Sequence, residues 1–546
     1  TNPQQVNLTS VPNGGGFSVV GASGTLSRLP NNRVGNKSMA FDNSNYGFKD
    51  IVKSGTFELN SNFSGKSANQ FLATFTKVRD TRTFNGGIFP TIDIFNNDGN
   101  NYMSVGMDPF TNNNDVINNI YSFIDNFTYF VGKHTLTAGA SYEYQKVGNM
   151  FMPGSNQYYA FNSLNDFMTN RPPAYFAYTF SLVKGETAVY SANLKIAQLG
   201  VYLQDEINVN ERFKLTAGIR IDKPIYLENA LENPAVTALE FPDSKGNPTH
   251  YNTSNWPKGT ILWSPRIGFR WDVDGDRSLI IRGGTGLFTG KIPFVFLTNM
   301  PTNSGMYQFG GAITSPARLP NYLFTTVTNA YQDSFPSTAG TSAPANIVLM
   351  DPNFKFPQVW RTNIAFDKRF GMGWTFTVEA AVTKDVHAVR MRNANQRDPN
   401  GQFTNNSDTR PRYLTTGDRK IYPNLSSAIV LENTNKGGGF FLTTQISKSL
   451  AKGFYGSFAY TYTYSGDVTA NPGSQATSVW NANPTRGTQN DLELAYSQYA
   501  IPHRLVGTVS YRREYLKHLA TTISIYYEGT SLGNYSYVYA SDLNND

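Results

Sequence analysis

Residues 197–221, AQLGVYLQDEINVNERFKLTAGIRI, decide the fold of this chain. Odd positions are apolar from Ala197 to Leu203 and again from Phe213 to Ile221, whereas the even positions between them are polar, tyrosine or glycine. Alternation with a period of two is typical of a strand with one apolar face. The short segment 208–211 separates the two runs, so the stretch is predicted to form a β-hairpin.

The same pattern recurs along the chain, around seven short turns. The turns are Phe63-Ser64-Gly65-Lys66, Val131-Gly132-Lys133-His134, Asn208-Val209-Asn210-Glu211, Val273-Asp274-Gly275-Asp276, Phe370-Gly371-Met372-Gly373, Leu450-Ala451-Lys452-Gly453 and Arg513-Glu514-Tyr515-Leu516-Lys517. They predict fourteen arms, roughly 54–63 with 67–82, 118–131 with 134–149, 194–208 with 211–223, 260–273 with 277–290, 358–370 with 373–391, 437–450 with 453–465, and 501–513 with 517–530. Long polar loops separate these hairpins. Short turns alternating with long loops indicate an antiparallel meander with all short turns on one rim.

The length and composition of the arms favour a membrane barrel over a soluble sheet. The arms reach about ten residues or more, the length that a tilted strand needs to cross a bilayer. Aromatic residues make up 14% of the chain, with 32 Tyr and 38 Phe, and many Tyr fall near strand ends. We therefore predict an all-β fold, a transmembrane antiparallel β-barrel. A secreted β-sandwich or solenoid that binds glycans is the soluble alternative, and it would bury its apolar strand faces.

Charge and composition exclude several other classes. The chain contains no cysteine, which argues against a disulfide-stapled scaffold and against thiolate chemistry. The net charge of +7 is spread without basic runs, so no nucleic-acid partner is expected. The mean hydropathy is −0.39, and no apolar run is long enough for a transmembrane helix. No Ser/His/Asp grouping stands out, so we interpret the protein as non-enzymatic.

Metal binding has only one candidate site. Asp542, Asn544 and Asp546 have the oxygen spacing that opens a Ca²⁺ loop, and no other cofactor is expected. A similar spacing at Asp272, Asp274 and Asp276 lies in a tight turn, where Asp and Gly are expected for backbone reasons.

Several strings resemble the strands of TonB-dependent outer-membrane receptors. These are GVYLQDE at 200–206, FKLTAGIRID at 213–222, SPRIGFRW at 264–271, RGGTGLFTG at 282–290 and PHRL at 502–505. Taken in order, they are most similar to the Oar-like branch of Bacteroidetes type, from about Phe57 to Asp546. The resemblance implies a barrel of about 22 strands with a plugged lumen. We expect residues 55–546 to be part of that barrel, with residues 1–54 an unassigned lead-in, an earlier barrel segment or a loop. The plug, its TonB box and an N-terminal domain are expected outside this chain.

The resemblance also implies a function and a location. Receptors of this type lie in the outer membrane of Gram-negative bacteria, bind an extracellular ligand and import it with energy transmitted by TonB. The implied partners are outer-membrane lipid, the TonB complex through the plug, an unknown extracellular ligand and a surface lipoprotein. The alternatives are an adhesin and a protein-translocation or porin-like barrel without active import. Tyr158, Tyr159, Trp256 and Trp480 are the candidate ligand contacts, and packing within loops or at the membrane interface is their alternative role.

Overall fold

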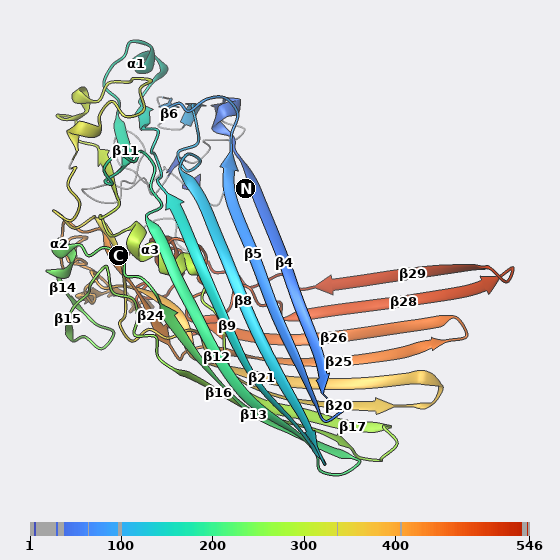
Figure 1. Cartoon of the computed structure of the whole chain (residues 1–546). Helices are drawn as coiled ribbons and strands as arrows, with labels where there is room; N and C mark the ends of the chain where they lie inside the picture. Colours follow the sequence, from blue (N-terminus) through green and yellow to red (C-terminus); the bar gives the residue numbers. More distant parts are fainter. Residues whose placement is uncertain are drawn as a thin grey trace.

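A large sheet of long antiparallel strands dominates the computed structural model (Figure 1). The structure describes residues 5–6, 29–30, 38–63, 65–96, 101–335, 337–404, 407–537 and 543. Within these ranges the sheet has fourteen long strands. They are the hairpins β4 (Gly47–Phe63) with β5 (Ser67–Thr83), β8 (Asn114–Val131) with β9 (His134–Phe151), β12 (Ala192–Asn208) with β13 (Phe213–Tyr226), β16 (Leu262–Asp272) with β17 (Leu279–Thr289), β20 (Gln358–Arg369) with β21 (Trp374–Asn393), β25 (Gly438–Ala451) with β26 (Phe454–Asp467), and β28 (His503–Tyr515) with β29 (Leu519–Thr530). We call this sheet the wall.

The hairpins join side by side in chain order. For example, β5 pairs with β8, β9 with β12 and β13 with β16, all antiparallel. Among the described strands, β4 pairs only with β5 and β29 only with β28, so the wall is an open sheet with these two strands at its edges. The seven predicted turns join these hairpins. The boundaries differ by a few residues, most at β4, which begins at Gly47 and crosses the boundary expected at residue 54.

Local backbone chemistry explains why the turns are short. In the turn between β16 and β17, Oδ1 of Asp272 accepts hydrogen bonds from the backbone N–H groups of Gly275 and Arg277, each at 3.0 Å. Lys452 and Gly453 link β25 to β26 with φ angles of 51° and 82°, the left-handed pair that a tight hairpin requires. Asp272 therefore acts as a turn residue, as does Asp276, whose Oδ1 accepts from the backbone N–H of Ser278 at 2.8 Å.

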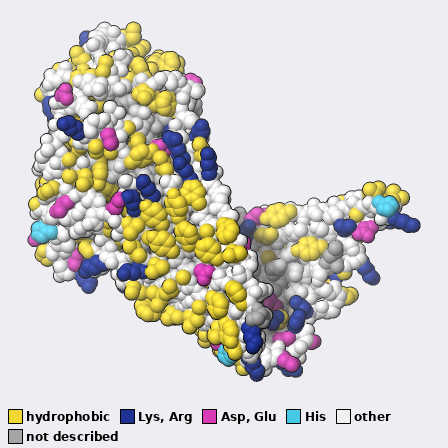
Figure 2. All heavy atoms as spheres, viewed as in Figure 1, with side chains coloured by type: hydrophobic (Ala, Val, Ile, Leu, Met, Phe, Trp, Pro, Cys, Tyr) yellow, Lys and Arg dark blue, Asp and Glu magenta, His cyan; other side chains and the backbone are white. Residues whose placement is uncertain are grey.

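The two faces of the wall differ in polarity. Leu199, Val201 and Leu203 of β12 are 41%, 45% and 55% exposed, although they are apolar. Figure 2 shows a broad field of hydrophobic side chains on this face. On the opposite face, Tyr202 donates a hydrogen bond to Asn126 and Arg220 pairs with Asp222 at 2.8 Å. Exposed apolar residues on one face and paired polar residues on the other are the arrangement of a barrel wall with lipid outside.

The long connections form a second layer, the cap, which sequence analysis predicted only as polar loops. A six-stranded sheet in the order β18-β11-β10-β6-β7-β3 is its centre. These strands are β3 (Met39–Ala40), β6 (Thr91–Phe95), β7 (Asn101–Val105), β10 (Tyr158–Phe161), β11 (Tyr175–Ser181) and β18 (Gln308–Ile313). That prediction was incomplete because segments such as TIDIF and YFAYTFS are short, so their alternation is too brief to distinguish a strand from a loop, and they pair with segments distant in sequence.

Shorter elements complete the described chain. The helices are α1 (Leu164–Met168), α2 (Pro234–Thr237), α3 (Phe294–Thr302) and α4 (Ala476–Asn481), with 3₁₀ turns η2 (Asp42–Ser44), η3 (Leu319–Asn321), η4 (Gln332–Ser334) and η5 (Gly371–Gly373). The short strands are β1 (Gln5–Val6), β2 (Leu29–Pro30), β14 (Glu240–Pro242), β15 (Pro248–His250), β19 (Asn346–Met350), β22 (Gly401–Gln402), β23 (Pro411–Arg412), β24 (Ser427–Thr434) and β27 (Ala495–Tyr496). None of the described helices is long and apolar enough to cross a membrane.

A shared core attaches the cap to the wall. Val147, Leu194 and Ile196 lie at the cap end of β9 and β12, in line with the polar face, and they are buried against Leu297 and Met300 of α3. The strand β24 extends this contact by pairing with the last residues of β21 and, in parallel, with β19. The cap therefore covers the polar face of the wall at the end opposite the short turns.

Candidate functional site in the cap

The cap sheet brings together connections that are far apart in sequence. Its strand β10 pairs in parallel with β6 and antiparallel with β11, and β11 pairs with β18 from a third connection. Two predicted ligand contacts, Tyr158 and Tyr159, are neighbours on β10. Both are 0% exposed, so their side chains lie inside the cap.

Tyr158 belongs to a buried polar network on one face of the cap sheet. Its hydroxyl donates to Oδ2 of Asp93 at 2.8 Å, and the hydroxyl of Ser104 donates to Oδ1 of the same carboxylate at 2.6 Å. The Tyr158 ring also meets the Tyr175 ring edge-on, with centroids 5.6 Å apart. Because a buried carboxylate without partners is costly, this hydroxyl stabilises the sheet.

Tyr159 points to the other face, into a cluster of aromatic rings. Its ring centroid lies 5.0 Å from that of Phe176 and 5.4 Å from that of Phe324. Burial raises the pKa of Tyr159 and raises the pKa of the nearby Tyr178 to about 12. Both tyrosines therefore stay neutral at physiological pH. That Tyr158 and Tyr159 contact a ligand stays a prediction.

The two predicted tryptophans lie apart from these tyrosines and partly exposed. The Trp256 ring stacks on Tyr226 with centroids 5.5 Å apart and planes at 5°, and its Nε1 donates to the carbonyl of Glu228 at 2.6 Å. In α4, Nε1 of Trp480 donates to Oδ1 of Asn490 at 3.0 Å. Both rings pack at the margin of the core shared with the wall. Their proposed ligand role also stays a prediction.

Next to Trp480 lies a buried charge cluster that sequence analysis did not identify. Nε of Arg390 and Nε of Arg392 lie 3.2 and 3.1 Å from the carboxylate of Glu432, and all three side chains are at least 89% buried. The Tyr251 hydroxyl accepts from Arg392 at 3.4 Å. Arg390 and Trp480 also line a small hollow of about 10 Å³. One carboxylate between two guanidinium groups holds β21 and β24 together.

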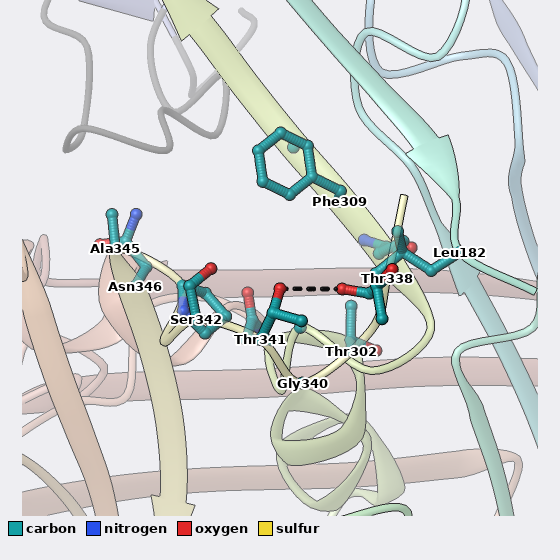
Figure 3. Close-up of a pocket in the computed structure, with 14 residues that line it drawn as sticks. Leu182, Thr302, Phe309, Thr338, Gly340, Thr341, Ser342, Ala345 and Asn346 are labelled. Carbon is teal, nitrogen blue, oxygen red and sulfur yellow. Dashed lines mark hydrogen bonds between the residues drawn. The ribbon is translucent and has the colours of Figure 1, made fainter. Parts of the chain in front are cut away.

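A larger cavity of about 60 Å³ opens between α3, β18 and the loop that leads into β19 (Figure 3). Its polar lining consists of hydroxyl and amide side chains, and its apolar lining includes one aromatic ring. The polar residues are Thr302, Asn303, Gln308, Thr338, Thr341, Ser342 and Asn346, and the apolar ones include Leu182, Phe309 and Pro344. None of the described residues that line it carries a charge. The cavity therefore suits a small neutral group that offers hydrogen bonds, not an ion.

Buried contacts hold the walls of this cavity in place. The side chain of Asn233 is fully buried and donates to the carbonyls of Ser304 and Ser342 at 2.8 and 3.1 Å, so it joins two walls. Gly305 has a φ of +73°, and a Cβ there would lie 2.6 Å from Cγ of Pro344. Oε1 of Gln308 is buried and has no hydrogen-bond partner among the described residues. It leaves one acceptor available beside the cavity.

The described residues show no arrangement suited to metal binding. No group of three His, Asp or Glu side chains among them is close enough to hold an ion. The predicted calcium ligands Asp542, Asn544 and Asp546 lie outside the described residues. The calcium site stays a prediction.

Comparison with known proteins identifies the family to which this fold belongs. The family described as "Outer membrane beta barrel domain" matches residues 10–521. The chain belongs to this family. It is an outer-membrane protein of a Gram-negative bacterium, and its family is one of barrel domains, not of enzymes. No curated protein matches the sequence.

Among solved structures, the chain is similar to the outer membrane transporter YddB from Escherichia coli, with a TM-score of 0.51 and 11% identity over 89% of this chain. It also resembles a mutant of the ferric enterobactin receptor PfeA from Pseudomonas aeruginosa, with a TM-score of 0.46, 11% identity and 89% coverage. It spans 52% and 50% of those chains, about half their length. At this identity the similarity concerns the fold.

The cavity and the charge cluster could not be predicted from the sequence, for a common reason. Asn233, Gln308 and Glu432 lie in different connections, and only folding brings each to its partners. The sequence contains one local signal. Arg390 and Arg392 stand two positions apart at the end of a strand, so both side chains lie on the same face.

Proposed function

We propose that this chain is the wall and the ligand-facing cap of a TonB-dependent receptor of the Oar-like branch. In this proposal an extracellular ligand binds in the cap and is imported with energy transmitted by TonB through a plug. The observation that carries the proposal is the cap itself. Its connections fold over the polar face of the wall and share a core with it, whereas a passive pore needs an open mouth.

The uncharged cavity indicates where a ligand group would enter. Phe309 offers a ring, and hydroxyls and amides from three segments surround it (Figure 3). Since about 10–15 Å³ of such cavity volume is enough to hold one water molecule, a cavity of about 60 Å³ admits a group of several heavy atoms. We therefore expect a small neutral portion of a larger ligand to enter, with partly exposed Trp256 and Trp480 as further candidate contacts.

A thiol-labelling experiment tests the transport mechanism. Because the chain has no cysteine, an introduced cysteine is the only thiol within these 546 residues, and the unsubstituted full-length protein gives the labelling background. Gln204→Cys places it on the polar face of β12, opposite Gly218, and Lys184→Cys places a control in an exposed cap segment. Both variants of the full-length protein are labelled in the native outer membrane with a membrane-impermeant maleimide, with and without a protonophore.

The three candidate functions predict different labelling. A TonB-dependent receptor should label slowly at Gln204→Cys, several-fold faster in energised cells than after collapse of the proton gradient. An adhesin should label slowly in both conditions, and an open pore rapidly in both, so either result would overturn the proposal. Labelling at Lys184→Cys should not respond to the protonophore.

A further inference from the structure

Lysines line up across neighbouring strands on the apolar face of the wall. Lys53 of β4 pairs in register with Lys77 of β5, which pairs with Asn119 of β8. Asn119 pairs with Lys146 of β9, and Lys146 pairs with Lys195 of β12. Side chains that share a register row point to the same face of a sheet. These four lysines form the lysine row.

The lysine row borders a row of aromatic rings. Phe75, Tyr121 and Tyr144 lie two positions closer to the short turns on β5, β8 and β9, and so on the same face. Their rings contact in sequence, with centroids 5.0 Å apart for Phe75 and Tyr121 and 5.9 Å apart for Tyr121 and Tyr144. Aromatic rows of this kind mark the level of the lipid headgroups. Figure 2 shows Lys and Arg side chains gathered between the hydrophobic field and the cap.

The distance from the turns supports that level. Lys53 lies ten positions before Phe63, the last residue of β4, and Lys77 lies ten positions after Ser67, the first residue of β5. Ten residues at about 3.4 Å each, on strands tilted by about 40°, rise about 26 Å. The apolar band of outer-membrane barrels is about 25 Å tall, with its short turns in the periplasm. Lys53 and Lys77 therefore lie where the outer leaflet meets the cell exterior, and Lys146, twelve positions after His134, lies about 5 Å further out.

Two further strands end their apolar face in the same way. Lys223 of β13 and Lys384 of β21 are exposed, share the outward face, and each lies ten positions after the first residue of its strand. Between each strand start and its lysine, the outward positions carry no charge. Because a lysine recurs at the same distance from the short turn on several strands, we infer that its position corresponds to a fixed depth relative to the membrane.

The positive charges of the lysine row are only partly neutralised by neighbouring carboxylates. Like charges opposite each other on neighbouring strands destabilise a sheet, yet Lys53 faces Lys77 and Lys146 faces Lys195. Lys195 pairs with Glu228. Within the described part of the chain, no carboxylate forms an ion pair with Lys53, Lys77 or Lys146. An external anion would relieve this repulsion.

We propose that Lys53, Lys77 and Lys146, with Lys195 beside them, bind the phosphate groups of a phosphorylated glycolipid in the outer leaflet. The aromatic row contacts the upper acyl chains and sugar of the same lipid. Ammonium groups bind phosphate as point charges, and several at one level bind an anionic membrane surface. This surface is independent of the transport mechanism proposed above.

Lipid binding to the full-length protein in neutral detergent tests the proposal. The probes are bisphosphorylated lipid A, the same lipid without phosphate, and inorganic phosphate, each titrated and followed by native mass spectrometry. The test variant is Lys53→Gln/Lys77→Gln/Lys146→Gln. The control Lys66→Gln/Lys184→Gln/Lys245→Gln removes the same charge from exposed positions elsewhere. Heat-modifiable gel mobility confirms that each variant keeps its wall.

The proposal expects the test variant to bind bisphosphorylated lipid A about 100-fold more weakly than the native protein, and the control variant to bind within about twofold of it. Phosphate-free lipid should bind the native protein as weakly as bisphosphorylated lipid binds the test variant. Equal binding of both lipids, or undiminished binding by the test variant, would overturn the proposal. If inorganic phosphate also binds and its binding depends on the same three lysines, then free phosphate and not a lipid is the ligand, and the proposal fails.

Discussion

The wall and the cap are both built of β-strands, but they form by different rules. In the wall, each long strand pairs with the next across a short turn, as β12 does with β13, and each carries a period-two pattern. In the cap, β10 lies between β6 and β11, and β11 pairs with β18 from beyond residue 300. Neighbouring pairs cost little loop-closure entropy, whereas distant pairs depend on burial of many side chains together. The wall is therefore encoded by residues close in sequence, whereas the cap depends on the cooperative packing of distant segments.

The largest expected effect tests whether the cap unfolds independently of the wall. Phe176 is fully buried and its ring lies 4.9 Å from that of Tyr322. Phe176→Ala should destabilise the cap by roughly 3–5 kcal/mol, because the ring is lost and a cavity remains. Limited proteolysis at rising temperature should cut the cap earlier, while the wall keeps its heat-modifiable mobility.

Met168→Ala is the matched control for that variant. Met168 is 73% exposed on α1, so its loss should change stability by less than about 0.5 kcal/mol. If Phe176→Ala abolishes the mobility shift of the wall as well, cap and wall are one cooperative unit, and the comparison between them fails.

The next effect tests which face of the wall meets lipid. Leu203 lies five positions before the end of β12 on the apolar face, near the middle of the predicted band. Leu203→Arg should cost about 2–4 kcal/mol in lipid, because a guanidinium is placed in hydrocarbon. Urea unfolding in lipid vesicles measures the difference. Gln204→Arg, on the opposite face of the same strand, should be tolerated, and equal costs at both positions would contradict the assignment of the faces.

A smaller effect is the difference in pH at which buried tyrosines of the cap and exposed tyrosines ionise. Burial raises the pKa of Tyr178 to about 12 and also raises the pKa of Tyr159 and Tyr175. Since the folded pKa lies above the unfolded one, the stability that these groups contribute is complete below about pH 10 and is lost as the pH rises towards 12. Absorbance at 295 nm should show a late tyrosinate phase that coincides with protease sensitivity of the cap. A single phase near pH 10 with the cap intact would contradict this burial.

The smallest effect concerns Asp125, a charged residue among apolar residues on the lipid face. Asp125 of β8 points outward between Phe123 and Phe127, and it accepts a hydrogen bond from Asn69 at 2.9 Å. Asp125→Leu should raise the stability of the wall by about 1 kcal/mol or less, because a polar group leaves the apolar band. Urea unfolding in vesicles measures it. A clear loss of stability would show instead that the pair with Asn69 stabilises β5 against β8.

The sequence by itself determined the wall: seven hairpins, their turns, the apolar face and the length suited to a membrane. Each of these features depends on residues close in sequence, since period-two alternation and turn chemistry act within one hairpin. The buried positions of Tyr158 and Tyr159, the carboxylate of Glu432 between Arg390 and Arg392, and the cavity clamped by Asn233 were decided only by the tertiary structure. Their partners lie in connections distant in sequence, so the alternation and turn chemistry within one hairpin do not identify them.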